Sequence, residues 1–280
     1  MKTKSLILSF LTLVVIFTGC KKSDPEPTAY DNADAGKGGI LYDKFWATEA
    51  GYDQSSANLT TFNAKADFFR CKQCHGWDLL GTNGGYISRG PKTSRPDVSP
   101  LNLFQIAHSK TEQELFDAMK KTTGRRAVSY DLSTYDPTSN ATEGNKMPDY
   151  SALLTDAQMW DLVKFMKEGA IDVTKIYDVT YTGAYPTGTA TYANLGKDGN
   201  AASGDAYYAN NCAGCHGSDG KLILMEEMSV GKFTRKKAYE VQHKVKFGQL
   251  GSAMVGATTM TEAQMKDLYK ALSSETKFPE

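Results

Sequence analysis

The chain has little histidine and cysteine, and it has no excess of charge of either sign. Its 280 residues include only four histidines and five cysteines, and 32 basic side chains balance 32 acidic ones. Because nucleic-acid binding needs a concentrated basic surface, this balance argues against a DNA or RNA partner. Proline is scarce and low-complexity sequence is absent, so the composition is that of an ordinary folded protein. The length suits two domains of roughly 100 to 140 residues.

Long apolar runs are also missing. The longest, Leu6 to Phe17, follows Lys2 and Lys4 and is too short to span a bilayer comfortably, which predicts a targeting segment. It ends in Phe17-Thr18-Gly19-Cys20, which resembles the lipobox of bacterial lipoproteins. The resemblance implies a signal peptide at residues 1–19 and acyl chains on Cys20, which would anchor the exported protein to a bacterial membrane, facing the periplasm or the cell surface. The alternative is an ordinary cleaved signal with an incidental cysteine.

The other four cysteines form two pairs of identical spacing, each followed by histidine: Cys71-Lys72-Gln73-Cys74-His75 and Cys212-Ala213-Gly214-Cys215-His216. This spacing places two thiols where they can add to the two vinyl groups of one haem, with the histidine as an axial iron ligand. A zinc site would need two more ligands for each pair, and only His108 and His243 are spare. A thioredoxin-like redox pair lacks a surrounding βαβ pattern. The motifs therefore predict two covalently bound haem c groups.

This assignment uses every cysteine. With Cys20 lipidated and the other four in thioether bonds, no thiol remains for a disulfide or for an axial cysteine ligand. The dihaem thiosulfate dehydrogenases, which use a cysteine on their active haem, are therefore excluded.

Two similar segments indicate that the chain contains a duplication. Residues 154–162 and 260–268 parallel each other, and each begins a predicted helix with a capping box, Thr155 with Gln158 and Thr261 with Gln264. The apolar residues of these helices recur at three- to four-residue spacing, so we expect their methionines to pack in the cores. Further helices are predicted after Gly38 and across 204–211, and the alternation in 176–181 predicts a short hairpin between the two halves.

Together these features resemble two fused class I cytochrome c domains. The resemblance implies an all-α fold with a flexible tether at 20–36, an enlarged first domain at 37–171, a linker at 172–198 and a minimal second domain at 199–280. In this family the sixth iron ligand is a methionine on the loop before the last helix. That pattern implies Met147, followed by Pro148, in the first domain and Met254 in the second, where Val255 replaces the proline. Met260 competes with Met254 but aligns with Leu154, so we expect it to pack.

His/Met ligation fills both axial positions and raises the reduction potential. It therefore favours an electron carrier that relays electrons between unidentified redox partner proteins over an enzyme. Two alternatives stay open: a dihaem enzyme such as a cytochrome c peroxidase, for which His108 is the spare histidine of the first domain, and the cytochrome subunit of a larger oxidoreductase.

The remaining polar features have simpler expected roles. His108 should lie at the surface before a helix capped by Thr111 and Glu114, and His243 should face solvent. Long loop insertions enlarge the first domain between His75 and Met147, and their arginines could pair with haem propionates. A basic cluster in the second domain is either a solvated helix face or a docking surface for an acidic redox partner; its members are Lys232, Arg235, Lys236, Lys237, Lys244 and Lys246.

Overall fold

The computed structural model describes residues 28–45, 70–83, 98, 100–125, 147–183, 188–249 and 252–280. Cys20, the leader and most of the loop insertions of the first domain lie outside these residues. The described helices and strands are α1 (Ala35–Asp43), α3 (Cys71–His75), the 3-10 turn η2 (Gly81–Asn83), α4 (Leu103–Ser109), α5 (Glu112–Lys120), η4 (Tyr150–Ala152), α6 (Asp156–Lys164), the π-helical turn η5 (Phe165–Gly169), η6 (Val173–Lys175), β1 (Asp178–Thr182), β2 (Thr189–Ala193), α7 (Ala201–Asn211), α8 (Ala213–His216), α9 (Val230–Lys236), α10 (Ala238–Phe247) and α11 (Glu262–Leu272).

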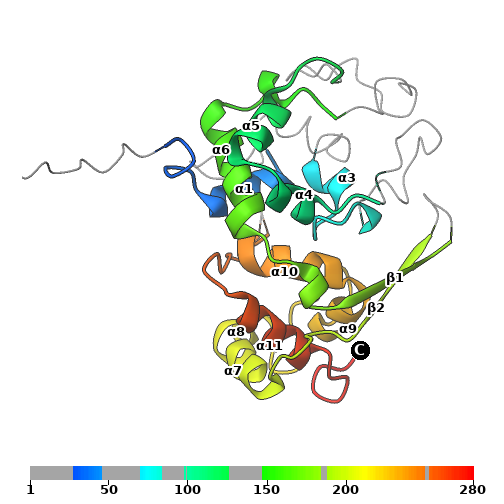
Figure 1. Cartoon of the computed structure of the whole chain (residues 1–280). Coiled ribbons are helices and arrows are strands. Elements are labelled where there is room, and N and C mark those ends of the chain that lie inside the picture. The colour runs from blue at the N-terminus through cyan, green and yellow to red at the C-terminus, as the bar shows by residue number, and fades with distance from the viewer. Residues whose placement is uncertain are drawn as a thin grey trace, which may run out of the picture.

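The predicted all-α architecture is confirmed, because the described chain consists of helices and one small sheet. Figure 1 shows two helical groups, with α1 and α3 to α6 in one and α7 to α11 in the other. Each group has its own core of buried apolar side chains. Within the described residues no helix is long and apolar enough to cross a membrane.

The first and last helices of each group cross closely. In the first group the backbone N–H of Asp34 donates to Asp161 Oδ1 over 2.7 Å, and a Cβ on Gly38 would overlap the carbonyl oxygen of Asp161. The second group repeats this crossing. The N–H of Asn200 donates to Asp267 Oδ1 over 2.6 Å, and a Cβ on Gly204 would overlap the carbonyl of Asp267. Glycine is thus required where α1 meets α6 and where α7 meets α11, and the duplication seen in the sequence extends to the packing.

The predicted capping boxes are confirmed at α5, α6 and α11. In each, a threonine side chain accepts from the third backbone N–H of the helix while the Glu or Gln side chain accepts from the threonine N–H. The apolar faces of α6 and α11 point into the cores, and Met159 and Met265 on these faces are almost completely buried. Both methionines therefore pack in the cores, as expected.

The hairpin between the two groups is also confirmed. Strands β1 and β2 pair antiparallel, from Asp178 opposite Ala193 to Thr182 opposite Thr189. Tyr192 on β2 stacks against Tyr239 of α10 and donates from its hydroxyl to Asn83 Oδ1 over 3.0 Å. The hairpin therefore contacts both groups of helices.

Helix α10 is the part of the second group that lies against the first, as Figure 1 shows. It follows α9 in the second domain, yet Phe247 at its C-terminal end belongs to the core of the first. The ring of Phe247 occupies the space that a Cβ on Gly39 of α1 would need. Burial of α10 on both sides overturns one prediction: His243 is only 1% exposed, because the first domain covers the polar face of α10.

Candidate haem-attachment sites

Both Cys-x-x-Cys-His motifs form a single helical turn. In the first, α3 runs from Cys71 to His75 and ends at Gly76, whose φ of +75° favours glycine. In the second, Cys212 ends α7 and begins α8, which runs to His216 and ends at Gly217 with φ +80°. Each turn therefore holds two thiols and an imidazole on one short rigid element.

The cysteines of both motifs are reduced. No disulfide joins Cys71 to Cys74 or Cys212 to Cys215, and burial raises the pKa of Cys71 and of Cys212 to about 11. Two cysteines of this spacing that form no disulfide suit addition to the two vinyl groups of one haem, which is the chemistry of covalent haem attachment.

The imidazole of His216 is oriented by the backbone. Its Nδ1 lies 2.9 Å from the carbonyl oxygen of Ile223. Because a carbonyl only accepts, Nδ1 carries the proton and Nε2 is left with a lone pair for a metal. The donor set of the second motif therefore fits a haem iron.

His75 differs from His216 in its surroundings. Its Nδ1 is buried and has no hydrogen-bond partner among the described residues, and burial lowers its pKa to about 4. The neutral imidazole that results is the form that binds iron. The Tyr42 hydroxyl donates to the Gly76 carbonyl over 2.7 Å, which fixes the end of the first motif against α1.

A zinc site gains no support from the described residues. No group of three or more His, Cys, Asp or Glu side chains gathers there in a way that could hold a metal ion. The two spare histidines are engaged elsewhere. His108 is exposed on α4, as predicted, where its Nδ1 donates to the Phe104 carbonyl over 2.8 Å. His243 hydrogen-bonds to the Gly39 carbonyl.

The two methionines predicted as sixth ligands lie on loops before a helix. Met147 is half-buried and packs against the first core, three residues before η4. Met254 is half-buried in a turn where its carbonyl accepts from the Gln249 N–H over 3.1 Å. Met260 is only 4% exposed and belongs to the second core, as expected for a packing residue.

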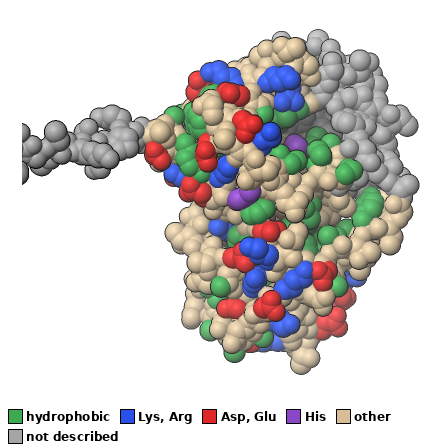
Figure 2. Space-filling model, in the orientation of Figure 1, with side chains coloured by type: hydrophobic (Ala, Val, Ile, Leu, Met, Phe, Trp, Pro, Cys, Tyr) green, Lys and Arg blue, Asp and Glu red, His purple; other side chains and the backbone are tan. Residues whose placement is uncertain are grey.

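The basic cluster of the second domain does not form an open cationic face. Lys244 and Lys246 are buried, and the Lys246 Nζ donates to the Met260 carbonyl. Three more members are paired with carboxylates, Lys232 with Glu280, Arg235 with Glu275, and Lys237 with Glu226 and Glu240. Figure 2 shows basic and acidic side chains interspersed over the face it displays. The docking-surface hypothesis for this cluster is therefore not supported.

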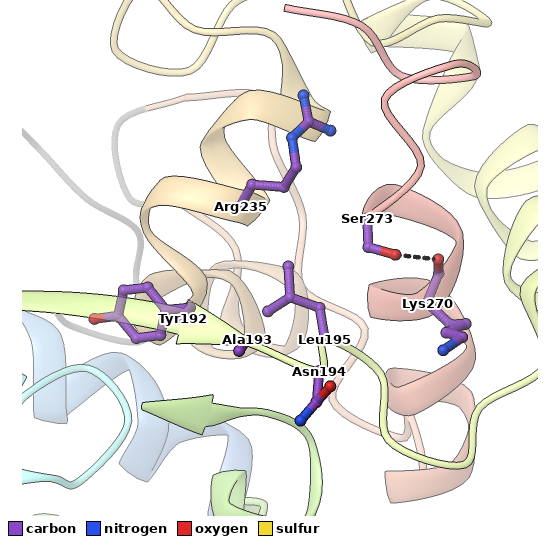
Figure 3. A pocket seen from close by; sticks show the side chains of 7 residues that line it. All are labelled: Tyr192, Ala193, Asn194, Leu195, Arg235, Lys270 and Ser273. Atoms are coloured by element: carbon purple, nitrogen blue, oxygen red, sulfur yellow. Dashed lines mark hydrogen bonds between the residues drawn. The ribbon is translucent and has the colours of Figure 1, made fainter. Parts of the chain in front are cut away.

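An open pocket of about 320 Å³ lies between β2, α9 and α11. Figure 3 shows Leu195 and Asn194 beside Lys270 and Ser273, whose hydroxyl donates to the Lys270 carbonyl. Arg235 donates instead to the carbonyls of Leu272 and Phe278. No residue of either motif lines this pocket, so it is separate from the attachment sites.

Sequence reasoning missed the residues of α10 that contact the first motif. Gln242 Nε2 donates to the Trp77 carbonyl over 3.1 Å, and the His243 ring lies 4.6 Å from the Trp77 ring. In the sequence these polar residues occupy what looks like a solvent-facing side of an amphipathic helix. Both side chains are in fact completely buried, and the sequence of α10 contains no feature that indicates this burial.

Two helical units, each with a Cys-x-x-Cys-His turn and a methionine loop before its last helix, define a protein of the covalent-haem class. Residues 62–170 match the family model described as cytochrome c, and residues 199–270 match the model described as cytochrome c oxidase, cbb3-type, subunit III. The chain therefore contains two tandem cytochrome c domains. Such domains bind haem c covalently and serve electron transfer. No curated protein and no solved structure matches the chain.

Proposed function

We propose that this protein is an exported electron carrier with two haem c groups, one in each domain. Cys71 and Cys74 hold one group, and Cys212 and Cys215 hold the other. The axial ligands are His75 with Met147 and His216 with Met254. The orientation of His216 by the Ile223 carbonyl carries the proposal, because it prepares Nε2 for iron without help from another side chain.

Bound haem supplies an iron that changes its oxidation state by one electron. The protein supplies the ligands of the iron and holds them in position. The backbone hydrogen bond holds the His216 ring in one tautomer, and the glycines after each motif allow the chain to turn away from the imidazole. The methionine loops provide thioether sulfur, which favours the reduced state. With both axial positions taken by protein, the sites suit electron transfer better than binding of a substrate.

The second motif offers an edge that a redox partner protein could approach. Leu222, whose N–H donates to the His216 carbonyl, is 71% exposed, and Val255, next to Met254, is 87% exposed. The first motif is more enclosed, because Gln73 and Trp77 within and after it are buried. We propose that partners exchange electrons at the second domain while acyl chains on Cys20 hold the protein at a bacterial membrane, facing the periplasm or the cell surface.

The peroxidase alternative needs a histidine that can reach and leave the first iron. His108, the candidate, is exposed and hydrogen-bonded within its own helix, so it lends this alternative no support. The alternative in which the chain is the cytochrome subunit of a larger oxidoreductase requires the same sites. Copurification with a catalytic partner would favour that alternative.

The test is a redox titration of the purified holoprotein with near-infrared spectroscopy. The proposal expects two haems per chain, two methionine-to-iron charge-transfer signals in the oxidised protein and no turnover of hydrogen peroxide. A high-spin haem or rapid peroxide reduction would instead identify an enzyme.

A further inference from the structure

Helix α10 is anchored in both domains. On one side the Tyr269 hydroxyl of α11 donates to the Ala238 carbonyl over 2.6 Å and accepts from the Gln242 N–H over 3.0 Å. On the other side His243 Nε2 donates to the Gly39 carbonyl over 2.9 Å. The helix therefore cannot shift relative to either domain without breaking buried hydrogen bonds, each of which is costly to leave unmade.

The same helix reaches the first motif directly. The fully buried side chain of Gln242 donates to the carbonyl of Trp77, two residues after His75. The Trp77 ring lies against the His243 ring, and the Lys244 ammonium group lies 5.1 Å from the centre of the Trp77 ring. Three consecutive residues of α10 thus contact one residue beside the predicted axial ligand.

The C-terminal end of α10 reaches the predicted ligand loop of the second domain. Lys244 Nζ donates to Gln249 Oε1 over 2.6 Å, and the Gln249 N–H donates to the Met254 carbonyl over 3.1 Å. The Ala257 N–H closes the loop back onto the Val245 carbonyl over 2.9 Å. A continuous set of contacts therefore joins Trp77 to the loop that carries Met254.

We propose that Gln242, His243 and Lys244 are positioning residues that lock the first haem motif to the methionine loop of the second domain, and so set the separation across which electrons pass between the domains. This inference rests on the proposed function of electron transfer. The rate of electron tunnelling falls steeply as the two haems move apart. A helix that holds the first haem motif and the methionine loop in place therefore controls the rate of electron transfer between the domains without binding iron itself. Such a role follows from contact geometry and needs a direct test of coupling.

The test compares full-length holoproteins. Gln242→Met removes the donor to Trp77 and keeps the length of the side chain. Tyr192→Phe is the matched control, because it removes another hydrogen bond between the domains, to Asn83, and keeps its ring on Tyr239. Lys244→Met breaks the contact with Gln249 at the other end, so the proposal remains testable should Gln242→Met fail to fold.

Two measurements are made on each variant: amide hydrogen exchange, and the rate at which an electron redistributes between the haems after partial photoreduction. In Gln242→Met we expect exchange in residues 76–79 to rise about fivefold, which corresponds to one hydrogen bond of about 1 kcal/mol. Electron redistribution should slow in Gln242→Met and in Lys244→Met and should be unchanged in Tyr192→Phe.

The inference fails if redistribution in Gln242→Met and Lys244→Met keeps the wild-type rate, whether or not amide exchange increases. It also fails if the Tyr192→Phe control slows as much as they do. Failure of the proposed function looks different, because it appears in the wild-type protein as a missing haem or a missing methionine signal.

Discussion

The imidazole of His243 in the second domain donates a hydrogen bond from Nε2 to the carbonyl of Gly39, 204 residues earlier in the chain. Because the carbonyl only accepts, Nε2 carries the proton and the buried Nδ1 has none. The ring is surrounded by Tyr42, Trp77, Phe165 and Phe247. Burial, with a smaller contribution from the nearby cations Lys244, Arg70 and Lys72, lowers its pKa to about 3, although the hydrogen bond to Gly39 acts in the opposite direction.

The first prediction concerns acid stability. A histidine with a folded-state pKa of about 3 and an unfolded value of 6.5 contributes stability that is complete above pH 6.5. As the pH falls from 6.5 towards 3, that contribution should decline by about 1.4 kcal/mol per pH unit, because the unfolded chain binds the extra proton. His243→Gln keeps an amide N–H at about the reach of Nε2, so it can still donate to Gly39, and it does not titrate. Denaturant unfolding of both holoproteins at pH 7 and pH 5 measures the difference, and parallel pH curves would contradict the prediction.

The error about His243 shows which features a local sequence pattern can reveal. The capping boxes and the haem motifs were predictable because their residues lie within four positions of each other in the sequence. The apolar face of α10, with Ala238 and Val241, was also visible. The opposite face is covered by Gly39 and Trp77, which are distant in sequence. The sequence of α10 itself does not indicate that this face is buried. The same burial removes Lys244 from the basic cluster.

The second prediction concerns the two helix crossings. Gly38→Ala and Gly204→Ala each place a methyl group on a backbone carbonyl, of Asp161 and Asp267 respectively. Overpacking of this kind costs about 1–3 kcal/mol or more, so both variants should have a lower free energy of unfolding. Gly214→Ala is the control, since a Cβ there meets no atom within 4 Å and alanine favours the helix. Equal destabilisation by all three substitutions, measured by urea unfolding, would refute this account.

The third prediction concerns salt. Lys232 and Lys237 are paired with carboxylates, and the large apolar side chains Leu222, Ile223 and Leu224 are exposed just after the second motif. Reduction of the holoprotein by small anionic and cationic reagents should therefore change little as salt shortens the Debye length from about 30 to 8 Å. Stopped-flow kinetics measures both rates. A steep loss of rate with the anionic reagent, removed by Lys232→Glu with Lys236→Glu, would restore the basic cluster as a docking surface.

The last prediction separates the ligand methionines from the packing ones. Met147→Leu and Met254→Leu should each abolish one methionine-to-iron charge-transfer signal and lower the potential of one haem, because leucine offers no sulfur. Met260→Leu is the matched control: Met260 is buried in the second core, where a leucine of similar volume costs less than about 1.5 kcal/mol. It should keep both signals. If Met260→Leu removes a signal and Met254→Leu does not, the sixth ligand of the second haem is Met260, and the turn held by Gln249 has only a structural role.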